Sequence, residues 1–187
     1  SEVYGDPEVH PQPESYRGSV NPTGIRACYD EGKRCAESLF YDFHRMHGLD
    51  IKVARLFNTY GPLMRSDDGR VVSNFICQSI SETPLTIYGD GTQTRSFCYI
   101  DDLVIGLKKL MKSNSNILYP INLGNPDEFT LLELVHEIEK ISKKELNIEF
   151  QPLPMDDPKM RRPDIRIAKN DLGWRPSIKL SEGLVNT

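Results

Sequence analysis

The feature that most constrains the fold is a long predicted helix followed at once by a short apolar strand. Residues 25–48 carry apolar side chains at helical spacing and end in a glycine, which is typical of a helix stop. Residues 51–57 form a short apolar run typical of a strand, and residues 1–5 are predicted to end another strand. A strand, a helix and a second strand in this order predict a crossover unit of a parallel sheet, so the predicted class is α/β.

The chain changes character near Asn58. Before it the predicted elements are long and regular, and after it they are short and separated by many turns. The sequence therefore divides into residues 1–60 and residues 61–187. Apolar spacing predicts helices over 71–81, 102–111, 131–142 and 165–172, and strands over 85–88, 95–100, 121–123 and 147–150.

Capping and turn signals sharpen some of these boundaries. Asp101 is a candidate N-cap for the helix that follows it. Thr130, with Glu133 three residues later, is typical of a capping box. Clusters of proline, glycine and aspartate interrupt the regular pattern and predict loops. These loops are residues 6–24, 58–69 and 152–164.

Composition argues against several kinds of site. With a net charge of −4 in 187 residues, the chain is not expected to present a general nucleic-acid surface. No apolar run approaches the ~20 residues that a membrane-spanning helix needs, so no membrane contact is expected from this segment. The four cysteines form no Cys-x-x-Cys pair and no metal-like spacing with a histidine, which predicts free thiols and no metal site. They are Cys28, Cys35, Cys77 and Cys98.

A pair of residues in the first helix suggests acid/base chemistry. Tyr29 and Lys33 are four residues apart, so a helix places them on one face. A nearby ammonium favours the phenolate form of a tyrosine, which can then take a proton from an alcohol. Taken alone, the pair is a weak signal, because a tyrosine and a lysine at this spacing usually form an ordinary contact on a helix surface.

The first residues predict a chain cut from a longer protein. The sequence opens at Ser1 with Ser-Glu-Val-Tyr-Gly and lacks an initiating methionine. Because the chain is expected to be part of a longer protein, the lack of a targeting segment in it gives no information about localisation. Free thiols favour a reducing compartment, so the cytoplasm is the expected location.

Three motifs together resemble a known family. They are Ser-Glu-Val-Tyr-Gly-Asp-Pro at residues 1–7, the Tyr-x-x-x-Lys pair, and Arg-Leu-Phe-Asn-Thr-Tyr-Gly-Pro at residues 55–62. They resemble the extended branch of the short-chain dehydrogenase/reductase family, whose members act on nucleotide sugars. This resemblance implies the C-terminal part of a Rossmann-type fold, with residues 1–60 as a remnant of the NAD-binding domain. Residues 61–187 would be mainly a smaller substrate-binding lobe, interleaved with late Rossmann elements.

Within that branch the sequence is most similar to the UDP-glucuronic acid decarboxylases (UDP-xylose synthases). The similarity lies in residues 1–13, 28–34, 68–75 and 161–165. It implies NAD-dependent decarboxylation of UDP-glucuronate to UDP-xylose through a UDP-4-keto intermediate. A 4,6-dehydratase would be expected to carry an Asp-Glu pair where this chain has Ser-Glu, and a 4-epimerase a small residue in place of Glu2.

The same resemblance assigns roles to five residues. Tyr29 would be the general base and later the acid, and Lys33 would activate it and hold the nicotinamide ribose. Glu2 would be an acid/base group at the sugar, and Ser1 would hydrogen-bond the sugar. Arg161 would lie beside the carboxylate or donate a proton, although an arginine is a poor acid because it stays protonated.

Further positions are implied to bind the cofactor or the substrate. Thr59 and Arg70 would join Tyr29 and Lys33 at NAD, although the sequence holds no Gly-x-x-Gly-x-x-Gly turn for the pyrophosphate. The substrate, UDP-glucuronate, would meet cationic, amide and helix-start groups. These are Arg26, Asn58, Val72, Ser73, Asn74, Phe75, Ile76, Thr86, Tyr88, Gln93, Arg95 and Arg161.

Other interpretations stay open at this point. The chain could belong to another nucleotide-sugar enzyme, a 4-epimerase or a 4,6-dehydratase, or be a catalytically silent fragment that dimerises. Members of the resembled family commonly form homodimers through the long helices beside the tyrosine helix. Leu39, Phe40 and Phe43 would then be dimer contacts, or else plain core. The Golgi lumen is the alternative location, if a preceding segment carries an anchor.

Overall fold

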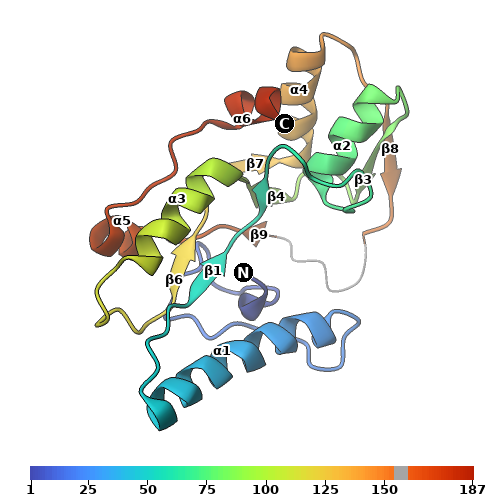
Figure 1. Cartoon of the computed structure of the whole chain (residues 1–187). Coiled ribbons are helices and arrows are strands. Elements are labelled where there is room, and N and C mark those ends of the chain that lie inside the picture. Colours follow the sequence, from blue (N-terminus) through green and yellow to red (C-terminus); the bar gives the residue numbers. More distant parts are fainter. Residues whose placement is uncertain (154–159) are drawn as a thin grey trace.

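The computed structural model describes residues 1–153 and 160–187 (Figure 1). The chain folds into an α/β arrangement in which β1 (Ala54–Leu56) pairs in parallel with β6 (Ile121–Leu123). Helices α1 (Ala27–His47) and α3 (Ile100–Met111) lie on opposite sides of this pair (Figure 1). The predicted α/β class with parallel strands is therefore confirmed.

Helix α1 begins and ends close to the predicted boundaries. Its last turn is followed by Gly48, whose φ of 66° is the left-handed conformation that glycine adopts without strain. The apolar residues that gave the helical pattern do not enter a core in this chain. Leu39, Phe40 and Phe43 are 49%, 54% and 48% exposed, so the interpretation of these residues as plain core is wrong here.

The remaining strands form three small sheets. Two are parallel pairs, and in the third β4 lies between an antiparallel and a parallel neighbour. The pairs are β2 (Thr59–Tyr60) with β5 (Cys98–Tyr99), and β3 (Leu85–Tyr88) with β8 (Ile148–Gln151). The third sheet has the order β7 (Glu128–Thr130), β4 (Thr94–Ser96), β9 (Met160–Arg161).

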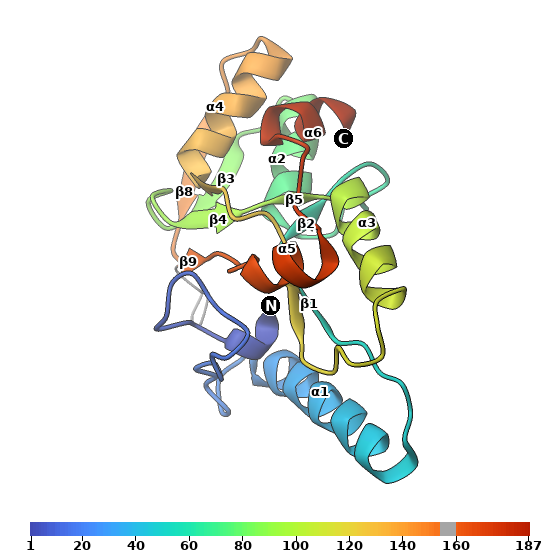
Figure 2. The ribbon, with the colours of Figure 1, turned by 90° about the vertical axis from the view of Figure 1, so that its left-hand side faces the viewer.

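Two buried clusters of side chains hold these elements together. One joins α2 (Val71–Ile80), α4 (Leu131–Ser142) and α6 (Leu180–Asn186), which gather at the end of the molecule away from α1 (Figure 2). The other surrounds β6 and α3 and includes Trp174, which follows α5 (Arg166–Leu172). The Trp174 indole nitrogen donates to the backbone oxygen of Asp102 at 2.9 Å, so this buried ring has its polar atom satisfied.

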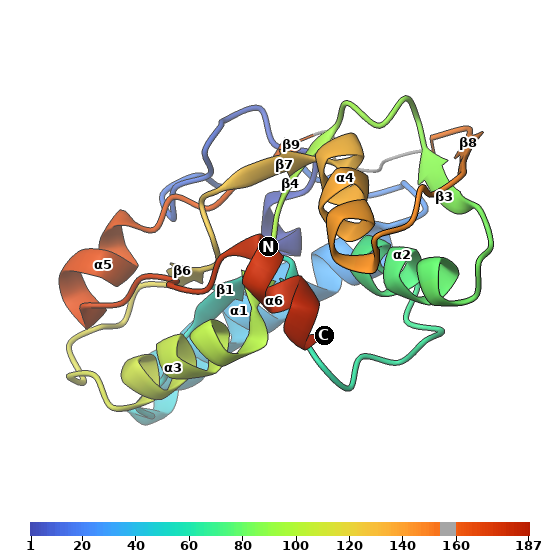
Figure 3. The ribbon, with the colours of Figure 1, turned by 90° about the horizontal axis from the view of Figure 1, so that it is seen from above.

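Two predicted local signals are confirmed. Thr130 accepts a hydrogen bond from the Glu133 backbone nitrogen, and the Glu133 carboxylate accepts one from the Thr130 nitrogen, which is the capping box expected at α4. Helix α5 ends at the predicted residue, Leu172, and Gly173 after it has the left-handed conformation. The loop over 6–24 is also confirmed, and it runs alongside β9 (Figures 2 and 3). Part of the predicted loop over 152–164 lies outside the described residues.

Several predicted boundaries are wrong. Residues 1–5 do not end a strand, because Glu2–Tyr4 form one turn of 3₁₀-helix, η1. Asp101 lies inside α3, whose N-cap is Tyr99, and the adjacent carboxylate of Asp102 is buried and accepts hydrogen bonds from later loop residues. The predicted strand over 95–100 is split into β4 and β5 at Phe97. Three strands lie where no strand was predicted: β2, β7, and β9, which falls within the loop predicted over 152–164.

The free thiols predicted from the cysteine spacing are present in the structure. All four cysteines are free, with Cys28 and Cys35 exposed and Cys98 buried. Among the described residues, no helix combines the length and apolar character required to cross a lipid bilayer. The same residues hold no cluster of histidine, cysteine, aspartate and glutamate side chains suited to a metal ion.

Candidate functional site

Most of the residues implied to bind substrate or cofactor meet at one cavity of about 430 Å³. Its walls come from η1, the start of α1, the start of α2, β3 and the β4–β9 pair. The segment after β1 completes it. The implied residues on its walls are Glu2, Arg26, Tyr29, Asn58, Thr59, Arg70, Val72, Asn74, Phe75, Thr86, Tyr88, Gln93, Arg95 and Arg161.

Tyr29 and Lys33 form the pair expected from their spacing. The Lys33 ammonium lies 5.2 Å from the centre of the Tyr29 ring, and the tyrosine is 55% exposed. Tyr29 also lines a second, larger groove of about 610 Å³, together with Lys33 and Ser1. Tyr29 therefore stands where two cavities meet, with its cationic neighbour on one side.

The second groove contains all four residues implied to contact NAD. Tyr29, Lys33, Thr59 and Arg70 line it, next to the carboxyl end of β1. This is the edge at which ligands bind in open parallel α/β sheets. A cationic lysine and arginine and a hydroxyl suit a ribose and a phosphate. The residues present thus fit the nicotinamide end of a dinucleotide.

The Glu2 carboxylate, which lines both cavities, is held between two guanidinium groups. Arg161 Nη1 donates to Glu2 Oε1 at 2.5 Å, and Arg26 Nη2 donates to Glu2 Oε2 at 3.0 Å. Arg161 also donates to the backbone oxygen of Gly5 at 3.4 Å. The Glu2 and Arg161 side chains are 15% and 6% exposed, so this is an ion pair largely withdrawn from water. Residues from the first and last thirds of the chain thus form one charged unit.

The environment of Glu2 keeps its carboxyl group ionised. Burial acts to raise its pKa, but the charge of Arg161, the hydrogen bond from Arg161 and the charge of Arg26 act against burial. The net result is a pKa below the ordinary value of 4.5. Glu2 is therefore a carboxylate at neutral pH, able to accept hydrogen bonds.

This shift predicts a pH dependence of stability. Because native Glu2 holds its proton less tightly than the unfolded chain does, its stabilising contribution is present above pH 4.5 and lost as the pH falls further. Replacing it by Glu2→Gln in the full-length protein should make the free energy of unfolding fall less steeply below that pH. The slope should change by up to about 1.4 kcal/mol per pH unit. Denaturant unfolding measured between pH 3 and pH 6 checks this.

Glu145→Gln is the matched control, because Glu145 is an exposed carboxylate outside the cavity. It should keep the wild-type slope. An unchanged slope in Glu2→Gln would show that the Glu2 ion pair is not formed in solution.

Asp30 is a buried neighbour of the site that was not predicted. It follows Tyr29 in α1 and is 7% exposed, and its Oδ1 atom has no hydrogen-bond partner among the described residues. Burial and then the charge of Glu2 raise its pKa above the ordinary value of 3.8. The signal that could have found it is its position inside the Tyr-x-x-x-Lys segment.

A largely buried ion pair between Glu37 and Arg55 fixes the helix that carries Tyr29. Arg55 on β1 donates to both Glu37 oxygens, at 3.0 Å from Nε and 2.5 Å from Nη2. Its Nη1 atom donates to the Tyr4 hydroxyl at 3.0 Å, and that hydroxyl donates to Asn122 Oδ1 at 2.7 Å. Glu37 lies one helical turn after the lysine of the pair. The network therefore sets α1 against β1 and β6.

Two of the implied substrate residues lie elsewhere. Ser73 and Ile76 line neither cavity. The Ser73 hydroxyl donates to the Arg70 backbone oxygen at 2.9 Å, and Ile76 packs against the buried cluster of α2. The helical period of α2 turns only some of residues 72–76 toward the cavity. The walls instead include residues that were not predicted, most of them apolar and without a chemical signal in the sequence. These are Met64, Gly69, Val71, Phe97 and Leu131.

Comparison with known proteins gives close relatives. The chain is 56% identical over 184 residues to UDP-glucuronic acid decarboxylase 3 of Arabidopsis thaliana, which covers 98% of this chain and 53% of that protein. It is 56% identical over 187 residues to UDP-glucuronic acid decarboxylase 1 of Danio rerio, covering 100% of this chain and 44% of that protein. The chain thus spans about half the length of the curated relatives it matches.

Solved structures show the same fold. UDP-glucuronic acid 4-epimerase from Bacillus cereus, in complex with UDP-glucuronic acid and NAD, is 32% identical with a TM-score of 0.88. The match covers 100% of this chain and 57% of that one. UDP-glucose 4-epimerase from Thermotoga maritima is 27% identical with a TM-score of 0.91, covering 100% and 59%.

A match to a family model shows which family the chain belongs to. The model of the NAD dependent epimerase/dehydratase family matches residues 1–124, a stretch that includes Glu2, Tyr29, Lys33 and Arg55. The match covers well over half of the chain and agrees with the structural neighbours. The chain belongs to the NAD dependent epimerase/dehydratase family.

Proposed function

We propose that this chain supplies the acid/base and substrate half of an NAD-dependent decarboxylase that converts UDP-glucuronate to UDP-xylose. The observation that carries the proposal is the Glu2–Arg161 ion pair on the wall of the cavity that Tyr29 also lines. Hydride transfer from a sugar hydroxyl needs the tyrosine and its lysine together with NAD⁺ as the hydride acceptor. A reaction that also removes a carboxylate and protonates a carbon has use for further charged groups. The relatives named UDP-glucuronic acid decarboxylase support this choice of reaction.

The residues of this chain have clear tasks in that reaction. Tyr29 takes the proton of the C4 hydroxyl, and the Lys33 ammonium lies 5.2 Å from the centre of its ring. Bound NAD⁺ would accept the hydride from C4 and later return it. The C4 ketone is β to the carboxylate, so the C5–C6 bond breaks, CO₂ leaves and the electron pair remains as an enolate. One proton added at C5 completes the exchange of carboxylate for hydrogen.

Charged groups around the cavity suit the substrate. Arg161 stays protonated at all working pH values, so it stabilises negative charge at the carboxylate or enolate rather than donating its own proton. The proton for C5 comes from solvent through a bound water, which the ionised Glu2 carboxylate can orient by accepting its hydrogen bond. Arg26 and Arg95 provide cationic donors for the diphosphate. Tyr88, which is 47% exposed at the end of β3, offers a ring on which uracil can stack.

The test is the reaction of the full-length protein with UDP-glucuronate and NAD⁺. We expect release of CO₂ and formation of UDP-xylose, identified by NMR, with no net consumption of NAD⁺. Formation of UDP-galacturonate without CO₂ would show a 4-epimerase instead. The absence of CO₂ release under conditions in which the protein binds the substrate would refute the proposal.

A further inference from the structure

The strand that carries Arg161 is short and needs support from outside its sheet. Strand β9 has two residues, and Arg161 is paired in parallel with Arg95 on β4. The Ser96 hydroxyl donates to the Arg161 backbone oxygen at 3.0 Å. A two-residue strand with one neighbour fixes backbone direction poorly, because few hydrogen bonds hold it. Other contacts must therefore define where the guanidinium lies.

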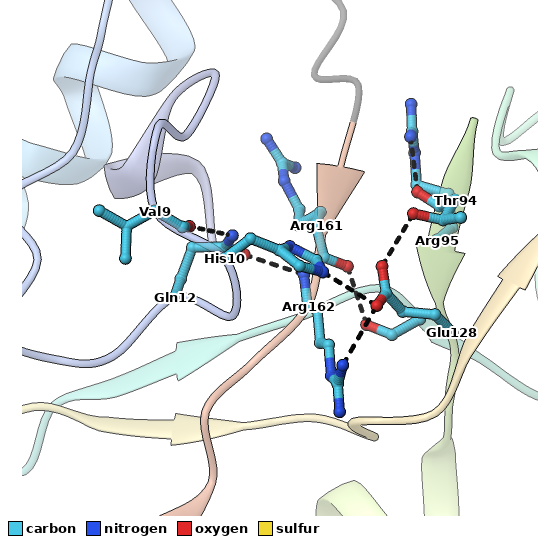
Figure 4. Close-up of polar contacts among 9 residues, drawn as sticks. Val9, His10, Gln12, Thr94, Arg95, Glu128, Arg161 and Arg162 are labelled. Atoms are coloured by element: carbon cyan, nitrogen blue, oxygen red, sulfur yellow. Dashed lines mark hydrogen bonds and ion pairs between the residues drawn. The ribbon is translucent and has the colours of Figure 1, made fainter.

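The support comes from Gln12 in the loop over 6–24 (Figure 4). Gln12 is fully buried. Its backbone nitrogen donates to the Arg162 oxygen at 2.9 Å, and its side-chain oxygen accepts from the Arg162 nitrogen at 2.9 Å. Its backbone oxygen accepts from the Asp164 nitrogen at 3.0 Å and from Asn122 Nδ2 at 2.9 Å. Gln12 thus holds Arg162, the residue after Arg161, through both the backbone nitrogen and the backbone oxygen of Arg162.

The Gln12 amide also fixes its own loop. Its Nε2 atom donates to the Val9 backbone oxygen at 2.7 Å. This loop leads from η1, which carries Glu2, to the start of α1, which carries Arg26. The amide therefore connects the strand of Arg161 to the segment that joins Glu2 to Arg26. Only a side chain with both an acceptor and a donor at this reach makes both bonds.

Glu128 makes a second set of contacts around the same strand (Figure 4). Glu128 on β7 accepts from Thr94 at 2.8 Å and from the Arg162 side chain at 3.4 Å, and it lies 2.9 Å from His10 Nε2. Figure 4 shows the Arg162 and Arg161 side chains leaving the strand in different directions. Arg162 therefore anchors the strand on the outside while Arg161 reaches the cavity.

We propose that Gln12 is a positioning residue that holds Arg161 against Glu2 in the active site. This inference rests on the proposed function, because it assigns Gln12 a part in the same decarboxylation. Gln12 lines neither cavity that contains Tyr29, so it acts through the strand rather than on the substrate. Displacement of a charged group by about 1 Å can cost on the order of 100-fold in rate, so the effect should be kinetic.

The experiment compares Gln12→Ala with wild type in the full-length protein. We expect kcat for CO₂ release to fall about 10- to 100-fold while KM for UDP-glucuronate changes less than about threefold. Gln12→Asn keeps the amide but is one carbon shorter, so we expect a smaller loss of kcat. This variant replaces Gln12→Ala in the experiment if the alanine variant does not fold. Ser15→Ala, an exposed position in the same loop, is the matched control and should keep wild-type kinetics.

A double-mutant cycle separates positioning from general damage. If Gln12 acts through Arg161, Gln12→Ala should add less than about twofold to the loss of kcat already caused by Arg161→Ala. The inference would be overturned if the two losses of kcat multiply in the double variant, or if both Gln12 variants keep the wild-type kcat. In either case CO₂ release by the wild type would leave the proposed function intact. No CO₂ release by the wild type would instead overturn the proposed function, and this inference with it.

Discussion

Replacing Tyr29 by phenylalanine should lower kcat for UDP-glucuronate by about 10²–10⁴-fold in the full-length protein. The change removes the hydroxyl that takes the C4 proton but keeps the ring over which the Lys33 ammonium lies. Substrate affinity and thermal stability should therefore change little. The initial rate of CO₂ release, with substrate affinity measured by calorimetry, checks both parts of this prediction.

The control for this variant is another exposed tyrosine. Tyr119 is 43% exposed, and its hydroxyl donates to Asp171 away from the two cavities. Tyr119→Phe should keep the wild-type rate. A Tyr29→Phe variant with wild-type turnover would remove Tyr29 from the mechanism, whatever its position in the cavity.

The largest effect on stability is expected at the buried pair between α1 and β1. Glu37→Ala leaves the Arg55 guanidinium, 12% exposed, without the two carboxylate oxygens that accept from it. Breaking a buried pair from one side costs about 3–5 kcal/mol, because a charge is left in a poorly solvated place. The full-length protein should show this loss in denaturant unfolding. Activity should fall as well, since Tyr29 lies on the same helix.

Glu31→Ala provides the comparison on the same helix. Glu31 pairs with Arg34 at 3.4 Å, but the two side chains are 45% and 38% exposed. Exposed pairs of this kind contribute about 0.3–0.5 kcal/mol, so this variant should remain close to wild type. If Glu37→Ala costs no more than Glu31→Ala, the buried pair does not hold α1 in place.

Helices with strong local signals could be predicted from the sequence. The capping box at Thr130 and the glycine after α1 depend on residues a few positions apart, so they are visible in the chain itself. The 3₁₀ turn at Glu2–Tyr4 has no such signal. Strands such as β2 and β9 have only two residues, which is too short for an alternating pattern to appear. Their pairing depends on distant segments.

The residues of the candidate site also differ in how far they can be predicted from local sequence. Tyr29 and Lys33 could be found from spacing on one helix. Glu2 and Arg161 could be found only through resemblance to a family, because nothing local links them. Gln12 could not be found at all, since its importance lies in hydrogen bonds to Arg162 and Val9 that exist only after the loop has docked.

The distance along the chain between Glu2 and Arg161 has a consequence for biosynthesis. The two residues are 159 positions apart in the sequence. At a synthesis rate of about 5–20 residues per second, roughly 8–30 seconds pass between the incorporation of one and of the other. During that interval the nascent polypeptide contains the tyrosine helix but not the arginine that completes the charged pair. The charged pair therefore cannot form until residue 161 has been synthesised.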